Sequence, residues 1–161
     1  MTEIIQNEVV VIGAGPGGYA AAFRAADLGQ RVVLIDKEES LGGVCLNRGC
    51  IPSKALLHLT KLIDDSKEAK KKGIVFDAPK INIEEIRSWK NAIISNLSSG
   101  ISRLAKSRKV KIIIGTAKFQ SINKLEVKNA ESTTYISFEK AIIATGSVSK
   151  TIPILPEDSD R

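Results

Sequence analysis

A glycine-rich turn between a short apolar run and a helix constrains the fold of this chain more than any other feature. Residues 8–12, Glu-Val-Val-Val-Ile, form a short apolar run without alternation, as expected of a parallel strand that is buried on both faces. The glycine-rich residues 13–18 follow directly. A helix is predicted to begin near Pro16 and to end at Gly29, and residues 31–36 are predicted to form a second strand. This order predicts an α/β fold with a parallel sheet and flanking helices.

The same turn has the spacing of a dinucleotide-binding site. Gly13 would make the tight turn, Gly15 would let the backbone approach a pyrophosphate, and Gly18 would let the helix pack close to the strand. The free N–H groups of the helix N-terminus favour phosphate. Asp36, at the end of the second strand, would accept hydrogen bonds from a ribose. The alternative is a turn that serves packing alone.

Residues 42–54 hold both cysteines of the chain, Cys45 and Cys50. On a regular helix, five steps would separate their Cα atoms by roughly 8 to 9 Å. A disulfide needs Cα atoms within about 7 Å. If the pair is bridged, the backbone must leave the helical form, and Gly49 and Pro52 permit that bend.

The charges around the cysteines favour reactive thiols. Arg48 lies between the cysteines and Lys54 follows them, and neighbouring cations lower the pKa of a thiol. Three alternatives compete: a structural disulfide, a zinc site that includes the lone His58, and two unrelated free thiols. Zinc needs more ligands than the chain offers here, and unrelated thiols leave the flanking glycines and proline unexplained. The pattern therefore favours a redox-active pair and no metal site.

The stretch Cys-Leu-Asn-Arg-Gly-Cys-Ile-Pro-Ser-Lys, followed by Ala-Leu-Leu-His, resembles the redox motif of the flavoprotein disulfide reductases, and most closely that of the dihydrolipoamide dehydrogenases. Glutathione reductases tend to carry Val-Pro-Lys-Lys where residues 51–54 are Ile-Pro-Ser-Lys, and this difference argues against a glutathione reductase. Mercuric reductase and an inactive truncated remnant remain alternatives. A disulfide does not readily accept a hydride from a nicotinamide, so a flavin is needed as a relay for the electrons. FAD is therefore assigned to the dinucleotide-binding turn at residues 13–18. NAD would be the co-substrate of the complete enzyme.

The resemblance also implies a role for individual residues. Cys45 would be the outer thiol that exchanges with a lipoyl dithiol, while Cys50 would lie against the flavin ring. Lys54 would lie near the flavin N5 edge, and Ala117 would meet the adenine. His58 is expected to be a partly exposed helix residue and not a catalytic base. The full set of expected FAD contacts is Gly13, Gly15, Gly18, Asp36, Lys37, Gly42, Gly43, Val44, Cys45, Lys54, Ala117, Thr145, Gly146 and Ser147.

The remaining chain predicts two helices and further strands. One helix should run from residue 55 to about 72, and a second from an N-cap at Asn82 to about Lys106. Residues 110–114 and 141–144 read as strands of the parallel sheet, the latter as a central strand. Residues 119–138 read as a small antiparallel β-meander that crosses the end of the sheet. One face of the second helix is expected to pack in the core through Ile86, Trp89, Ile93, Leu97, Ile101 and Leu104.

Composition limits the other function classes. The chain has 161 residues and a net charge of +6, but only 4% aromatic residues and a dispersed set of cations, which argues against nucleic-acid binding. No apolar run reaches the ~20 residues of a membrane helix, and no secretory signal is visible, so a cytoplasmic location is expected. The resemblance implies that residues 1–161 are the N-terminal segment of a Rossmann-like FAD-binding domain, incomplete and without the NAD-binding and dimer-interface domains. It also implies a homodimer that serves the lipoyl domains of a 2-oxo acid dehydrogenase complex.

Overall fold

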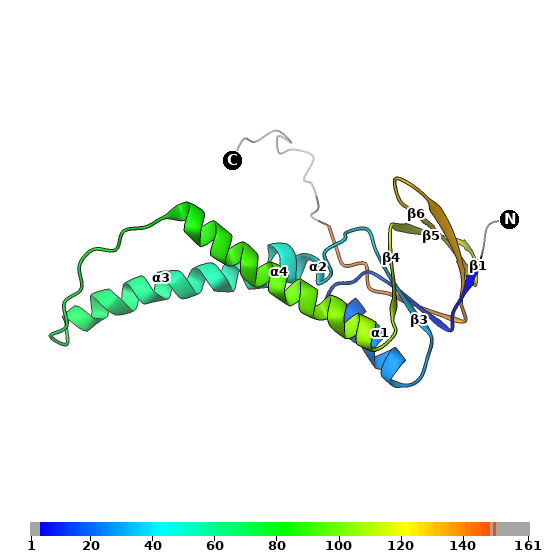
Figure 1. Ribbon diagram of the computed structural model, residues 1–161, viewed down its shortest axis with the longest axis horizontal. Helices are drawn as coiled ribbons and strands as arrows, with labels where there is room; N and C mark the ends of the chain where they lie inside the picture. Colours follow the sequence, from blue (N-terminus) through cyan, green and yellow to red (C-terminus); the bar gives the residue numbers. More distant parts are fainter. Residues whose placement is uncertain (1–3, 149, 151–161) are drawn as a thin grey trace.

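The computed structural model describes residues 4–148 and 150 (Figure 1). The helices are α1 (Pro16–Asp27), α2 (Gly43–Arg48), α3 (Cys50–Lys70) and α4 (Ile83–Ser107). The strands are β1 (Ile4–Gln6), β2 (Val9–Ile12), β3 (Val32–Asp36), β4 (Lys111–Ile114), β5 (Thr116–Ser121), β6 (Lys124–Lys128), β7 (Thr133–Ser137) and β8 (Lys140–Ile143). The predicted α/β class is confirmed.

Four strands form the predicted parallel sheet, in the order β4-β3-β2-β8. The apolar residues of β2 and β3 are buried except for Ile12, which is half-buried, as their continuous apolar runs predict. The prediction that residues 141–144 form a central strand is wrong for the described part of the chain. There β8 pairs with β2 alone, and Ile143 is 66% exposed.

A second sheet, in the order β1-β7-β6-β5, contains the predicted antiparallel meander. The expectation that the meander crosses the end of the parallel sheet is wrong, because the second sheet covers one face of the parallel sheet. Leu125, Val127 and Ile136 of the second sheet form a buried cluster with Val10 and Val33 of the first. Strand β1, which pairs in parallel with β7, was not predicted from the sequence. A three-residue strand is too short to give a periodic signal.

The other face of the parallel sheet packs against α1 and the C-terminal half of α4 (Figure 1). Ala22 of α1 and Ala105 of α4 are both fully buried there against Val11 and Leu34. The domain therefore has three layers: helices, parallel sheet and second sheet. The carboxyl ends of β2, β3 and β8 meet beside the N-terminus of α1, and this corner positions the site.

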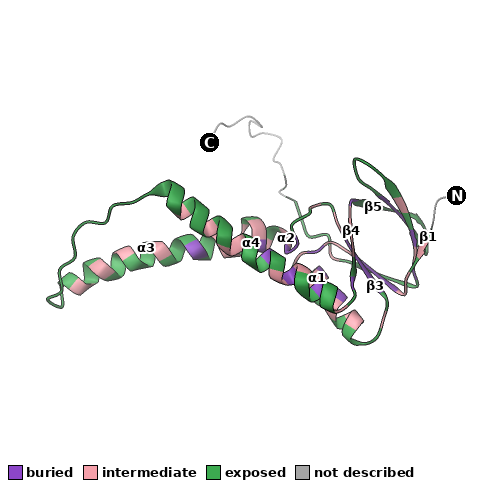
Figure 2. Ribbon diagram, viewed as in Figure 1, coloured by how far each residue is buried: buried purple, intermediate pink, exposed green. Residues whose placement is uncertain are grey.

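Helices α3 and α4 form a long hairpin that projects from the three layers (Figure 1). Asn82 caps α4 as predicted, because its side chain accepts hydrogen bonds from the backbone N–H groups of Glu84 and Glu85. The prediction that one apolar face of α4 is core is wrong for three of its six residues. Ile101 is buried, but Trp89, Leu97 and Leu104 are exposed. Figure 2 shows that α4 is mostly exposed or half-buried where it projects with α3. Trp89 lies in the projecting half of α4, which has only α3 beside it. Leu97 and Leu104 each stand one residue before a buried position, Ser98 and Ala105, and so lie about 100° around the helix from it.

Candidate functional site

The glycine-rich turn leads from β2 into α1 at the carboxyl edge of the parallel sheet. Gly13 has φ +101°, which favours glycine, and its N–H donates to the carbonyl of Ile35 at 2.7 Å. A Cβ added to Gly18 would overlap the carbonyl oxygen of Gly13. By contrast, Gly15 and Gly17 have open space above them. The turn therefore combines tight internal packing with an open backbone surface at the start of a helix.

Asp36 fixes this turn from the neighbouring strand. One carboxylate oxygen, Oδ2, accepts a hydrogen bond from the N–H of Ala14 at 2.6 Å. The other, Oδ1, accepts one from the N–H of Glu38 at 2.9 Å. The carboxylate thus lies directly beside the glycine turn, as the sequence spacing predicts. Each oxygen has a second lone pair that can accept a further bond from a ligand.

Two adjoining cavities run along the carboxyl edge of the sheet. The smaller, of about 210 Å³, lies beside β5 and includes Gly115 and Ala117 in its wall. The larger, of about 500 Å³, extends from the glycine turn to α2 and includes Cys45. They share four lining residues, namely Gly13, Asp36, Lys37 and Thr145. The two cavities therefore form one elongated trough that joins the glycine turn to the cysteine region.

Most of the predicted contact residues line this trough. Eleven of them do so: Gly13, Gly15, Asp36, Lys37, Gly43, Val44, Cys45, Ala117, Thr145, Gly146 and Ser147. Gly18, Gly42 and Lys54 do not. Gly18 packs against Gly13, and Gly42 has φ +113° and donates its N–H to the carbonyl of Ala14. These two glycines shape the site and do not face it.

Several residues that line the trough were not predicted from the sequence. Pro16, Gly17, Glu38, Arg48, Gly115, Thr116, Ala144 and Val148 also lie in the wall of the trough. Their neighbours in sequence were already assigned to the site, so extending each predicted motif by one residue would have found most of them. Arg48 is different, because its place depends on how α2 folds back toward β3. There its guanidinium pairs with the carboxylate of Glu38 at 2.6 Å.

The two cysteines lie on different helices, as the geometric argument requires. Cys45 is on α2 and Cys50 begins α3, and the break falls at Gly49, with φ −125° and ψ −104°. Both thiols are free in this structure. Cys45 lines the trough, whereas Cys50 is exposed and does not line it. The flavin-side role that the resemblance implies for Cys50 stays a prediction.

The predicted lowering of the thiol pKa is wrong for Cys45 in its net direction, although Lys54 acts in the predicted sense. The pKa of Cys45 is raised, first because its thiol is hydrogen-bonded to Cys50 and second because it is partly desolvated. Lys54 opposes this shift, but its effect is smaller. The side chain of Arg48 is paired with Glu38. The positive charge near the Cys45 thiol is therefore smaller than the positions of Arg48 and Lys54 in the sequence suggest.

This pKa shift predicts how fast Cys45 is alkylated at each pH. We expect Cys50→Ala to move the midpoint of the Cys45 alkylation profile to lower pH, because the hydrogen bond that stabilises the thiol is lost. Lys54→Ala should move it to higher pH, because the opposing cation is lost. Iodoacetamide labelling followed by peptide mapping measures both midpoints. Shifts of the same sign in the two variants would contradict this account.

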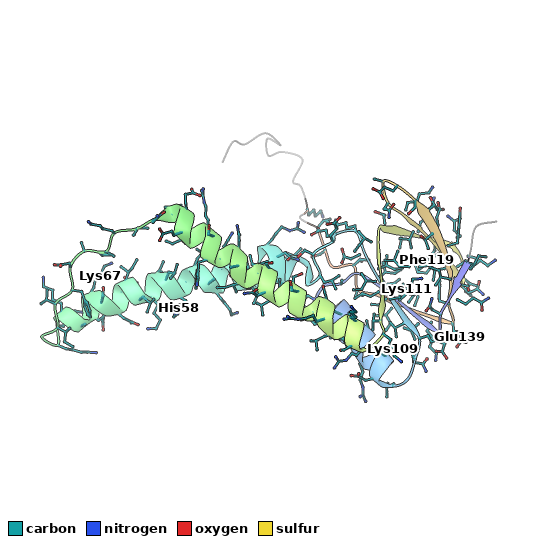
Figure 3. All side chains as sticks on the ribbon, viewed as in Figure 1. His58, Lys67, Lys109, Lys111, Phe119 and Glu139 are labelled. Carbon is teal, nitrogen blue, oxygen red and sulfur yellow. The ribbon has the colours of Figure 1, made fainter. Side chains whose placement is uncertain are left out.

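No cluster for a metal ion accompanies the thiols within the described ranges. In residues 4–148 and 150, no group of three or more His, Cys, Asp or Glu side chains could hold a metal. His58 is exposed on α3, in the projecting hairpin (Figure 3). The exposed position agrees with the expectation for His58. The chemistry that the site supports therefore centres on the trough and the cysteine pair.

Comparison with known proteins finds a matching family model and similar curated proteins. The family model described as pyridine nucleotide-disulphide oxidoreductase matches residues 7–160. A dihydrolipoyl dehydrogenase of Buchnera aphidicola subsp. Schizaphis graminum is 50% identical over 161 residues, which are all of this chain and 34% of that protein. A dihydrolipoyl dehydrogenase of Vibrio cholerae is 47% identical with the same coverage. The chain thus spans about a third of the length of the curated relatives that it matches.

A solved structure shares the fold. The Cu(II) complex of the HOCl-induced flavoprotein disulfide reductase RclA from Escherichia coli superposes with a TM-score of 0.75 and 28% identity. The match covers 94% of this chain and 31% of that one. None of the helices in the described part of the chain is long and apolar enough to span a membrane.

Proposed function

Because the chain belongs to the pyridine nucleotide-disulphide oxidoreductase family, we propose that it is the FAD-binding and disulfide-bearing part of a dihydrolipoamide dehydrogenase. One observation carries the proposal: a single trough joins an open glycine turn at a helix N-terminus to Cys45. A ligand with an adenosine at one end and a reactive ring at the other fits this arrangement. The names of the relatives support dihydrolipoamide as the substrate.

The residues present suit the parts of FAD. The wall at Ala117 would take the adenine, and the carboxylate of Asp36 would accept bonds from its ribose hydroxyls. The open backbone at Gly15 and the N-terminus of α1 would hold the pyrophosphate. The far end of the trough, between Cys45 and Ser147, would take the flavin ring. When bound, the flavin supplies a relay for two electrons between a nicotinamide and the cysteine pair.

The cysteine pair would exchange electrons with the dithiol substrate. A substrate thiolate attacks a sulfur of the Cys45–Cys50 disulfide, and the mixed disulfide resolves to the substrate disulfide and two protein thiols. The raised pKa of Cys45 would keep that thiol protonated after release. Partners in this proposal are NAD, a second copy of the subunit and lipoyl domains, and the location is the cytoplasm. The exposed apolar residues of the α3–α4 hairpin support an interface of this kind.

Titration with FAD tests the proposal. We expect FAD to bind the chain, and Asp36→Ala to raise the dissociation constant roughly 10- to 100-fold, because a hydrogen bond to a charged group contributes about 1.5–3 kcal/mol. Quenching of flavin fluorescence measures the constant. Asp77→Ala, in the exposed connection between α3 and α4, is the matched control and should leave the constant unchanged. Equal affinity in both variants would remove Asp36 from the site, and no binding by the wild-type chain would contradict the proposed function.

A further inference from the structure

We infer that Asn47 and Ser98 are positioning residues for the cysteine pair. Through the hydroxyl of Ser40 they fix the short helix α2 against α4, and in this way they set how Cys45 meets Cys50. The inference rests on the proposed redox function and adds the residues that hold its reacting groups in place. The three linking residues are Ser40, Asn47 and Ser98. None of them is a reacting thiol, and none lies in the turn that would hold the pyrophosphate.

Helix α2 needs outside contacts in order to keep its orientation. It has six residues, and neither Gly42 before it nor Gly49 after it provides a side-chain cap. A helix of this length is not stable in water by its own hydrogen bonds. Leu46 is its one buried residue and anchors it to the apolar core. Polar contacts add to this one apolar anchor: Arg48 pairs with Glu38, and the N–H of Gly42 donates to the carbonyl of Ala14. Both of these contacts tie α2 to the sheet side of the site, and neither ties it to α4.

The side chain of Asn47 ties the two ends of α2 to the preceding loop. Its Nδ2 donates to the carbonyls of Gly43 and Ser40, each at 3.1 Å. A carbonyl can only accept, so the amide nitrogen must be on this side and Oδ1 on the other. That oxygen accepts a hydrogen bond from the hydroxyl of Ser40 at 2.8 Å. Three bonds therefore fix both the position and the orientation of one amide.

Ser40 extends this network to α4. Its Oγ lies 3.0 Å from the Oγ of Ser98. The single hydroxyl proton of Ser40 is already donated to Asn47, so Ser98 must be the donor in this second bond. Ser98 is only 7% exposed, whereas Ser40 is exposed, so this bond is partly buried. The result is a directed chain from Ser98 through Ser40 to Asn47, in which each bond polarises the next.

This chain of bonds controls the geometry of the thiols because the cysteines lie on two separate helices. Cys45 moves with α2 and Cys50 moves with α3, and only Gly49 joins the two. Helix α4 packs against both α2 and α3 and so is their common reference. Without the network, α2 keeps the pair between Arg48 and Glu38 but loses its hydrogen-bonded link to α4, so α2 and α3 are held less firmly relative to each other and the sulfurs would meet less often. The effective concentration of one thiol at the other would fall, and the disulfide would become less stable relative to the dithiol.

A thiol–disulfide equilibrium tests this role. The 161-residue chain is equilibrated with reduced and oxidised dithiothreitol, quenched with acid and analysed by alkylation and mass. As the Sγ–Sγ bond forms, the two thiols lose two electrons and two protons, and oxidised dithiothreitol takes up both to become its dithiol. We expect Asn47→Asp and Ser98→Ala to lower the equilibrium constant for disulfide formation three- to tenfold, where tenfold corresponds to about 30 mV.

Matched controls separate positioning from general damage. Asn96→Asp and Ser99→Ala make the same changes at exposed positions of α4, and both should keep the wild-type constant. Ser98→Thr retains the hydroxyl, and its methyl has room in the adjoining cavity of about 340 Å³, so it should also keep that constant. If Asn47→Asp does not fold, as judged by circular dichroism, Ser98→Ala and Ser98→Thr decide.

The outcomes are distinct. Constants for Asn47→Asp and Ser98→Ala that equal the wild-type value would overturn the inference alone, and so would equal losses in the control variants. A wild-type chain that forms no disulfide would overturn the proposed redox function and this inference with it.

Discussion

Gly18→Ala is expected to lower the free energy of unfolding by about 3 kcal/mol or more. The new Cβ would overlap the carbonyl oxygen of Gly13 and lie 2.8 Å from its carbonyl carbon. Both atoms are backbone, so no side chain can rotate away, and α1 must move off β2. Forcing extra atoms into such a contact costs about 1–3 kcal/mol, occasionally more, and backbone contacts belong to the upper end. Urea unfolding followed by far-ultraviolet circular dichroism measures the change.

Gly17→Ala is the matched control for this substitution. It places the same methyl group one residue earlier on α1, where nothing lies within 4 Å of the added Cβ. Since alanine restricts the unfolded chain more than glycine does, we expect this variant to be as stable as wild type or more stable by about 0.4–1 kcal/mol. Equal unfolding midpoints for the two variants would show that helix and strand are not in close contact here.

The 161-residue chain alone is expected to show no lipoamide-dependent oxidation of NADH. It contains one dinucleotide fingerprint, and the proposal gives that site to FAD, so the nicotinamide has none. Proton transfer to and from a dithiol needs a base within about 3 Å. The single histidine, His58, lies eight residues beyond Cys50 on α3, or roughly 12 Å along the helix axis. It therefore cannot serve the thiols.

Absorbance of NADH, followed with purified chain, FAD and lipoamide, measures this activity. Slow oxidation of NADH that is independent of lipoamide would reflect free flavin and would not bear on the prediction. Steady oxidation that requires lipoamide and disappears in Cys45→Ser would contradict it. That result would mean that a nicotinamide site and a base exist within these residues.

Local patterns in the sequence predicted the parts of the fold that depend on neighbouring residues. The order of β2, the glycine turn, α1 and β3 follows from apolar runs and glycines within 30 residues, and the Asn82 cap follows from one side chain. Burial of α4 was predicted less well. Periodicity shows that Trp89 and Leu97 share a helix face, but not whether another layer covers that face.

Long-range pairings account for the parts of the site that the sequence did not predict. Arg48 lies between the two cysteines in sequence, yet its guanidinium forms an ion pair with Glu38 of the loop after β3. Ser98 looks like an ordinary polar residue of α4, and its bond to Ser40 joins positions 58 residues apart. No spacing rule connects such pairs, because their contact depends on how α4 lies across α2.

The partners of β1 and β2 have a consequence for the folding kinetics of the chain. Ile4 pairs with Tyr135 and Val9 pairs with Lys140, so both N-terminal strands find partners about 130 residues later in the sequence. At a synthesis rate of about 5–20 residues per second, these partners leave the ribosome roughly 10 s after the strands that need them. Contacts of such high sequence separation also slow the folding search itself. We therefore expect one edge of β2 to remain without a hydrogen-bonded partner while α3 and α4 are synthesised. That edge would be paired only when β8 has been made.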